Sequence, residues 1–162
     1  MQVHYLVAIG SNRPGRAGPP RRVTAAAIAA LPGVIAASRI IETAPLGPSL
    51  RRYANAAALI ESELAPDALL EALKAMERAA GRRAGRRWGG RVLDLDIVLW
   101  SGGCFAGSAL TVPHPRFRER VFVLEPLAEI APGWRDPLTG LTVRQLHARL
   151  TAGARRPTSR AG

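Results

Sequence analysis

The chain has 162 residues, of which 48% are hydrophobic, and a formal net charge of +11. A length of this order fits one compact domain with a substantial hydrophobic core. No apolar run approaches the roughly 20 residues that a membrane-spanning helix needs, and a single cysteine, Cys104, excludes an internal disulfide framework.

The net charge predicts an anionic partner, which is either nucleic acid or a small polyphosphate. Of the 23 basic residues only Lys74 is a lysine, so part of the arginine excess is background composition. The first residues, MQVHYLVAIGSN, lack the basic leader of a signal peptide. Together with the single cysteine, this indicates a soluble protein of the cytoplasm.

The first elements are a strand and a helix. Residues 3–10, VHYLVAIG, alternate and are rich in β-forming side chains, so they predict a strand that leads into a turn-rich loop. Pro19 and Pro20 then stand where a helix can begin. Apolar residues recur at helical spacing from there until Pro32 and Gly33 end the helix.

Three more strands and a second helix are expected before residue 100. Residues 34–43 (VIAASRIIET) and 53–62 (YANAAALIES) predict two strands, and residues 92–100 (VLDLDIVLW) predict a fourth. Between them, Pro66 opens a helix that ends near Gly81. The order βαββαβ predicts an α+β fold with a ferredoxin-like sheet, helices packed on one face and a C-terminal extension.

The pattern weakens beyond residue 100. Residues 110–132, LTVPHPRFRERVFVLEPLAEIAP, combine a Pro-rich loop with an apolar segment, and a short last helix follows. The last residues, TAGARRPTSRAG, have too little apolar content to pack. We therefore expect a single domain over residues 1–150 and a disordered basic tail over residues 151–162.

Two aspartates interrupt the apolar run of the fourth strand. Side chains alternate along a strand, so Asp94 and Asp96 share one face while their apolar neighbours share the other. Two residues of rise separate the aspartates by about 7 Å at the backbone, which suits a pair of metal ions about 4 Å apart. Hard oxygen ligands without a His or Cys cluster favour Mg²⁺, which in turn brings substrate phosphates. The alternative is that both aspartates face solvent or pair with arginines.

A glycine- and arginine-rich loop stands directly before this strand. Residues 81–91, GRRAGRRWGGR, carry guanidinium groups whose forked donors suit phosphate oxygens. The glycines favour mobility, so the loop can close over a nucleotide and expel water. The alternative is a solvated basic loop that contacts RNA.

Several motifs are similar to one known family. VAIGSN, ETAPLGP, YANAA, RRWGGRVLDLDIVLW and LTVPHPRFRERVFVLEPLAEIAP occur in this order through nearly the whole chain. They resemble the 6-hydroxymethyl-7,8-dihydropterin pyrophosphokinases, which transfer diphosphate from ATP to a pterin alcohol and release AMP. The resemblance implies a magnesium-dependent transferase of folate biosynthesis that is monomeric and binds neither nucleic acid nor membranes. The chain departs from the family pattern at Gly90, where proline is usual.

The resemblance also implies a role for each matching position. Asp94 and Asp96 would coordinate two Mg²⁺ ions that bridge the phosphates of the co-substrate ATP. Two arginines of the loop would bind and neutralise the polyphosphate during transfer: Arg82 and Arg91. Further ATP contacts would be Glu77, Trp88, Thr111, His114 and Arg120. The pterin would contact Thr43, Leu46, Tyr53, Asn55 and Phe122, with the rings of Tyr53 and Phe122 on either side of the heterocycle.

Two other classes of protein remain open at this point. A small nucleotidyltransferase also uses a Gly-Ser turn and a strand D-x-D pair, although Ser11 and Asp94 are far apart here. An RNA-binding module is compatible with a ferredoxin-like sheet and a basic charge. That function calls for exposed aromatic residues interleaved with basic ones on the sheet, and VAIGSN offers none.

Overall fold

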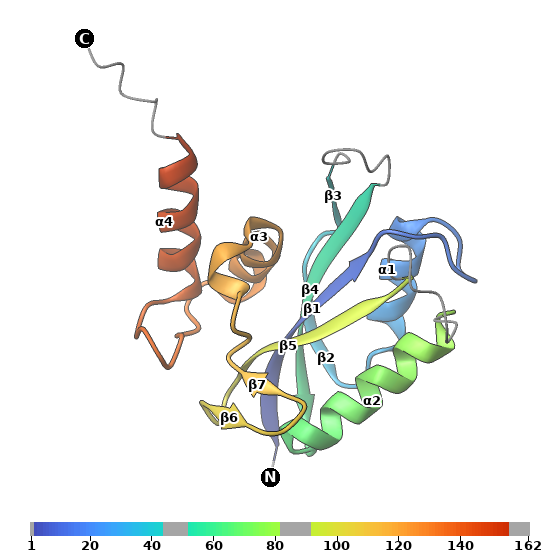
Figure 1. Ribbon diagram of the computed structural model, residues 1–162, viewed down its shortest axis with the longest axis horizontal. Coiled ribbons are helices and arrows are strands. Elements are labelled where there is room, and N and C mark those ends of the chain that lie inside the picture. Colours follow the sequence, from blue (N-terminus) through green and yellow to red (C-terminus); the bar gives the residue numbers. More distant parts are fainter. Residues whose placement is uncertain (1, 44–51, 82–91, 156–162) are drawn as a thin grey trace.

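The computed structural model describes residues 2–43, 52–81 and 92–155, with side chains described as far as residue 153. The first part of the fold follows the predicted order (Figure 1). Its elements are β1 (Val3–Ser11), α1 (Pro20–Ala30), β2 (Val34–Ala37), β3 (Ile41–Thr43), β4 (Tyr53–Ser62), α2 (Pro66–Ala79) and β5 (Asp94–Trp100). The extension adds β6 (Phe105–Ala106), β7 (Thr111–Val112), the short 3₁₀ helix η1 (Phe117–Glu119), α3 (Val121–Ile130) and α4 (Val143–Arg155).

The main sheet has the strand order β2-β4-β1-β5, and β3 also pairs with β4. Each of these pairings is antiparallel. If β2 and β3 are counted as one interrupted strand, this is the ferredoxin-like arrangement that the βαββαβ order predicts. The fold class is therefore confirmed, and β5 with its two aspartates lies at an edge of the sheet.

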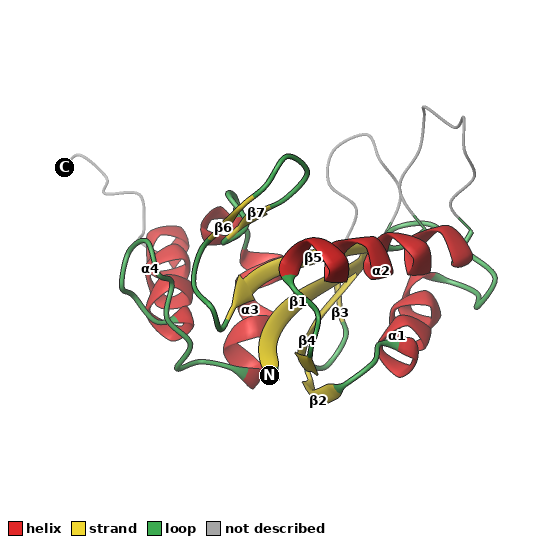
Figure 2. Cartoon of the chain, turned by 90° about the horizontal axis from the view of Figure 1, so that it is seen from below, coloured by secondary structure: helices red, strands yellow, loops and turns green. Residues whose placement is uncertain are grey.

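Each face of the sheet has its own hydrophobic core. On one face, alternate residues of β1, β4 and β5 pack against α1 and α2, through side chains such as Val7, Ile60 and Ile97. The opposite face packs against α3 and α4 through Leu6 and Val98. Figures 1 and 2 show α1 and α2 on one side of the sheet and α3 and α4 on the other. Burial of both faces explains the high apolar content of β1 and β5.

The helices begin where the sequence predicts. Pro20 and Pro66 occupy the first turns of α1 and α2, where a missing N–H costs nothing. After α1 the chain turns at Gly33, whose φ of 72° lies in the left-handed region. A Cβ on Gly33 would lie 2.1 Å from the carbonyl oxygen of Glu61, so only glycine fits this close approach to β4.

Two details differ from the sequence-based expectation. The strand expected over residues 34–43 is divided into β2 and β3, because the ladder with β4 shifts register near Ala36 and is interrupted after Ala37. The chain is also helical beyond residue 150, since α4 continues to Arg155. The hydroxyl of Thr151 donates to the carbonyl of His147 within this last stretch. Within the described residues, no helix is long and apolar enough to cross a membrane.

A buried carboxylate fixes the loop between α3 and α4. Asp136 is fully buried, and Arg118 of η1 donates to it through Nε and Nη2, at 2.5 and 2.7 Å. The hydroxyl of Thr139 and the amide of Leu138 donate to the same carboxylate, at 2.7 and 3.0 Å. Four donors therefore satisfy the acceptor sites of one ionised side chain.

Replacing this carboxylate, as Asp136→Asn, is expected to remove stability in a defined pH range. Burial raises the pKa of Asp136, but the hydrogen bonds from Arg118, Thr139 and Leu138, with the charge of Arg118, lower it from 3.8 to about 2. Because the folded-state pKa is depressed, the carboxylate stabilises the protein above about pH 4, and this contribution is lost as the pH falls toward 2. A pKa difference of this size between the folded and unfolded states corresponds to about 2 kcal/mol of unfolding free energy.

Urea unfolding of both proteins between about pH 2 and pH 7 measures this contribution. The two unfolding free energies should converge as the pH falls. If the two unfolding free energies differ by the same amount at every pH, the ionised carboxylate of Asp136 is not the source of the stability.

Candidate active site

The two aspartates of β5 lie on the face of the sheet that α3 covers. Leu95 and Ile97 are buried under α1 and α2, so their neighbours Asp94 and Asp96 lie on the opposite face. Both aspartates are partly exposed. The alternation that the sequence predicts is thus confirmed, and the two carboxylates share one surface.

Small residues form a floor beside the acid pair. The register of β1 places Gly10 between Asp94 of β5 and Asn55 of β4. In the next row Ala8 lies between Asp96 and Ala57. Strands lie about 4.8 Å apart, so Asn55 and Asp94 are about 10 Å apart at the backbone. Between them, the β1 residues of these two rows carry no side chain larger than a methyl group.

A pocket of about 450 Å³ runs along the outer edge of β5. Its walls come from α2, from β5 and from the segment that carries β7. It brings together five of the residues that the sequence singled out: Glu77, Asp94, Asp96, Thr111 and His114. The acid pair therefore borders both this pocket and the small-residue floor.

Glu77 is buried and acts on the edge strand. Its Oε2 accepts a hydrogen bond from the backbone N–H of Leu95, at 2.9 Å. Leu95 stands between the two aspartates, so this contact fixes the part of β5 that presents them. An edge strand leaves such N–H groups without a partner strand. The position expected to contact ATP thus also supports the acid pair.

His114 is held at the pocket by its backbone and its ring. Its N–H donates to the carbonyl of Val98 at 3.0 Å, and its Nδ1 accepts from the N–H of Arg116 at 3.1 Å. Burial lowers the pKa of His114, as do the charges of Arg120 and Arg116, whereas Asp94 raises it. The imidazole is therefore neutral at pH 7, and its Nε2 carries the proton because Nδ1 is an acceptor. A neutral N–H donor facing the pocket suits a phosphate oxygen.

Three of the residues expected to bind the pterin lie on β3 and β4, across the floor from the acid pair. Thr43 of β3 is paired with Tyr53 of β4, and Asn55 is two residues further along β4. Tyr53 and Phe122 are exposed at 37% and 39%, whereas the other described tyrosine, phenylalanine and tryptophan rings are buried or half-buried. Phe122 lies in the first turn of α3, and the guanidinium of Arg120 lies 5.9 Å from its ring centroid. Exposed rings are available to stack on a flat ligand.

Several predicted site residues lie outside the described residues. These are Leu46, Arg82, Trp88 and Arg91. Their roles stay predictions.

The sequence interpretation missed part of the pocket and all of the floor. Lys74, the only lysine of the chain, lines the pocket one turn before Glu77, and its helical spacing from Glu77 was the available signal. Residues 107–110 form another part of the wall and have no distinctive sequence pattern. The floor residues Ala8 and Gly10 alternate on β1, but only the register of three strands shows that they flank the aspartates.

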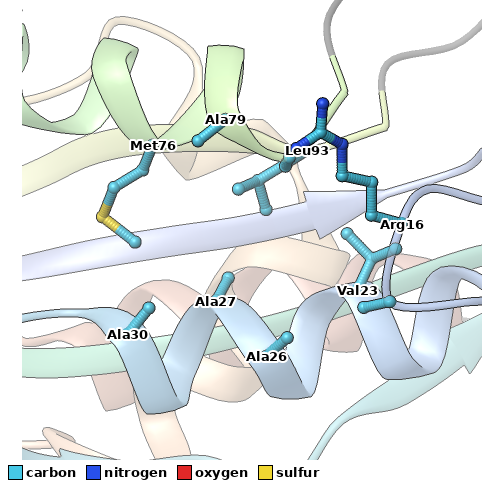
Figure 3. Close-up of a pocket in the computed structure, with 10 residues that line it drawn as sticks. Arg16, Val23, Ala26, Ala27, Ala30, Met76, Ala79 and Leu93 are labelled. Atoms are coloured by element: carbon cyan, nitrogen blue, oxygen red, sulfur yellow. The ribbon is translucent and has the colours of Figure 1, made fainter.

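A second hollow, of about 230 Å³, lies between α1 and α2. Figure 3 shows Ala27 and Ala30 of α1 across this hollow from Met76 and Ala79 of α2. Among the described residues that line it, Arg16 alone is charged and none carries a carboxylate. A polyphosphate with its metal ions does not fit such a lining, so the pocket beside β5 is the stronger candidate.

Gly10→Val is expected to block ligand binding on the floor without unfolding the chain. Even a Cβ at Gly10 would lie 3.2 Å from Oδ1 of Asn55, and the two methyl groups of valine would enter the space between Asn55 and Asp94. Displacing a bound reactant by about 1 Å can lower turnover roughly 100-fold. Calorimetric titration with the pterin that the family resemblance implies measures binding, and steady-state kinetics measure turnover. Ala8→Gly, which only removes a methyl group from the floor, serves as the control. Wild-type pterin affinity in Gly10→Val would show that the floor is not the binding surface.

The carboxylate pair fits a hard divalent cation. Within the described residues, no group of three or more His, Cys, Asp or Glu side chains is arranged to hold a metal ion. Mg²⁺ commonly takes one or two carboxylates and completes its coordination with water and substrate phosphates. Asp94 and Asp96 supply such a pair, and the adjoining pocket has room for the phosphates.

Fold and site together define an α+β protein whose acid pair faces a pocket suited to a nucleotide. The family model for 7,8-dihydro-6-hydroxymethylpterin-pyrophosphokinase (HPPK) matches residues 6–132. The chain belongs to this family.

Named relatives agree with this assignment. A Methylorubrum extorquens protein named 2-amino-4-hydroxy-6-hydroxymethyldihydropteridine pyrophosphokinase is 42% identical over 126 residues, which are 76% of this chain and 78% of the relative. A Pseudomonas aeruginosa protein of the same name is 42% identical over 136 residues, or 81% and 82% of the two chains. A Synechocystis relative of that name is 43% identical over 100 residues, or 62% of this chain and 51% of the relative.

The solved structures agree on the fold. Wild-type Plasmodium falciparum HPPK-DHPS superposes with a TM-score of 0.71 over 94% of this chain and 42% of that chain. The two sequences are only 12% identical there, so this likeness shows the fold alone.

Proposed function

We propose that the protein transfers diphosphate from ATP to the hydroxymethyl group of 6-hydroxymethyl-7,8-dihydropterin and releases AMP, as a step of folate biosynthesis. Membership of the HPPK family supports this reaction. The observation that carries the proposal is the position of Asp94 and Asp96, which border both a nucleotide-sized pocket and a floor of small residues. A transfer between two substrates needs such a junction.

The ATP is assigned to the pocket beside β5. Thr111, His114 and Lys74 line it with polar groups, and Arg120 acts electrostatically on His114 from nearby. Arg82, Trp88 and Arg91 are assigned to the same ATP by family resemblance. Glu77 holds β5 in place at the wall of this pocket.

The pterin is assigned to the floor. Tyr53 and Phe122 supply exposed rings, while Asn55, which is 9% exposed, offers an amide that can both donate to and accept from a heterocycle edge. Thr43 and Leu46 are assigned to the polar edge of the pterin by family resemblance. The ligand would then lie within about two strand spacings of the acid pair.

The chemistry is an in-line displacement at the β-phosphorus. The hydroxymethyl oxygen forms the new P–O bond, the bond from that phosphorus to the oxygen of the α-phosphate breaks, and AMP leaves. Such a transition state is loose, so catalysis depends on positioning and on charge neutralisation. We propose that two Mg²⁺ ions supply charge neutralisation and phosphate orientation when bound to Asp94 and Asp96. His114 donates to a phosphate oxygen, and Asp96 is our candidate acceptor for the hydroxyl proton.

One assay distinguishes this reaction from the other two classes. The protein is incubated with ATP, Mg²⁺ and the hydroxymethyl dihydropterin, and the phosphorus-containing products are identified. AMP with a pterin diphosphate supports the proposal. Free pyrophosphate would indicate nucleotidyl transfer, and no turnover, with RNA bound instead, would indicate a binding module. The monomeric state, the cytoplasmic location and the lack of nucleic-acid binding stay predictions.

A further inference from the structure

The segment between β7 and α3 carries two of the residues assigned to ATP. Residues 114–120, called the arch here, run from His114 at the pocket to Arg120 at the start of α3. The arch contains the three-residue η1, and its own backbone hydrogen bonds are three short-range ones, of 3.1 to 3.4 Å, within residues 114–120. None of these local bonds fixes its position against the sheet. Its position therefore depends on contacts with the rest of the molecule.

Three contacts hold the arch. At its first residue, the N–H of His114 donates to Val98 of β5. In the middle, Phe117 is fully buried in the core under α3 and α4. Next to it, Arg118 forms the two-point contact with Asp136. A forked guanidinium–carboxylate contact fixes orientation as well as distance, so it controls the direction in which the arch leaves η1.

Asp136 is itself rigidly held. Its N–H donates to the carbonyl of Leu141, and its carbonyl accepts from Gly140, both at 2.8 Å. Thr139 and Leu138 hold its carboxylate from the same loop. The loop between α3 and α4 therefore forms a fixed support behind η1, on the side of the molecule that α4 occupies (Figure 1).

The three arginines of the arch have different partners. Arg118 is committed to Asp136, whereas Arg116 and Arg120 act on the His114 ring. The guanidinium of Arg118 is therefore paired with Asp136 and does not bind the phosphates of ATP. Arg118 lies within η1, and only Glu119 separates it from Arg120. We therefore expect a displacement of Arg118 to displace Arg120 as well.

We propose that Asp136 is a positioning residue for ATP: through Arg118 it sets the arch so that His114 and Arg120 face the nucleotide. This inference rests on the proposed function, because it takes the pocket beside β5 as the ATP site. Asp136 has no contact with substrate in this account. Its effect is on the affinity for ATP and not on the acid pair, which the sheet holds separately.

The test compares Asp136→Asn, Arg118→Lys and the double variant. Arg118→Lys keeps a positive charge beside the buried carboxylate but loses the fork, so it should fold even if Asp136→Asn does not. The matched control is Glu129→Gln, which removes a carboxylate charge from an ion pair with Arg39 on the surface of α3. Calorimetry with magnesium and a non-hydrolysable ATP analogue gives Kd, and steady-state kinetics give KM and kcat. All measurements are made well below each unfolding midpoint.

Each single variant is expected to raise the Kd and KM for ATP about tenfold, the loss that about 1.4 kcal/mol of positioning represents, with kcat changed less than threefold. The double variant should bind ATP as tightly as the single variant with the higher Kd, because both substitutions remove the same contact between Arg118 and Asp136. Glu129→Gln should stay within about twofold of wild type.

Different failures have different meanings. A purely structural ion pair would lower the unfolding midpoint of the variants and leave their Kd and KM for ATP at the wild-type values; that result would overturn the inference. Additive losses in the double variant would overturn it as well. If the wild-type protein does not bind the ATP analogue, the proposed function fails instead.

Discussion

Asp96→Ala is expected to abolish diphosphate transfer while leaving the protein folded. The change removes one of two carboxylates that share a face of β5, at the junction of the pocket and the floor. Loss of one element of electrostatic stabilisation commonly lowers turnover about 100- to 1,000-fold. Here the expected loss is at the upper end, because we also propose this carboxylate as a ligand of the Mg²⁺ ions. Asp94→Ala should behave in the same way.

The fold should survive either change. Asp94 and Asp96 are partly exposed, and the apolar side of β5 that packs under α1 and α2 is unchanged, so both variants should still unfold cooperatively in the absence of Mg²⁺. Thermal unfolding followed by circular dichroism, with and without Mg²⁺, measures this. Added Mg²⁺ should stabilise the wild type through binding to the folded state and should stabilise the variants less.

The control for both measurements is Glu129→Gln, which changes one carboxylate on α3 away from the pocket. Turnover above about a tenth of the wild-type value in Asp96→Ala would rule out the assigned role of this carboxylate. Equal magnesium stabilisation in wild type and both variants would show that the cation binds elsewhere.

The acid pair was predictable from sequence because its geometry is local. Alternation along a strand places Asp94 and Asp96 together whatever the strand's neighbours are, and the burial of Leu95 and Ile97 confirms it. Helix starts at Pro20 and Pro66 were predictable for the same reason, since proline acts on its own turn.

The floor and the arch were not predictable from one sequence. The juxtaposition of Gly10 with Asn55 and Asp94 depends on the register of two ladders between distant segments, and no local pattern fixes that register. The contact of Arg118 with Asp136 likewise joins two loops that are irregular in sequence. Arginine and aspartate are common surface residues, and only their burial reveals the pairing.

Sequence and structure indicate different roles for Glu77. Family resemblance implies a nucleotide contact, whereas the structure places one carboxylate oxygen on the backbone of β5. Glu77→Ala removes this acceptor from a buried N–H, which costs about 1–3 kcal/mol of folding free energy. It also frees the stretch of β5 between the two aspartates, so turnover should fall about tenfold or more beyond any loss of folded protein.

Glu77→Gln distinguishes a strand-supporting role from a charge-based one. The amide oxygen of glutamine can still accept from Leu95, so stability and turnover should stay within about threefold of wild type. Glu71→Ala, which removes an exposed glutamate from the same helix, is the matched control. Urea unfolding, kcat and the KM for ATP are measured for all three variants. If Glu77→Gln loses as much ATP affinity as Glu77→Ala, the charge of Glu77 matters more than its hydrogen bond to β5, and the strand-supporting role is wrong.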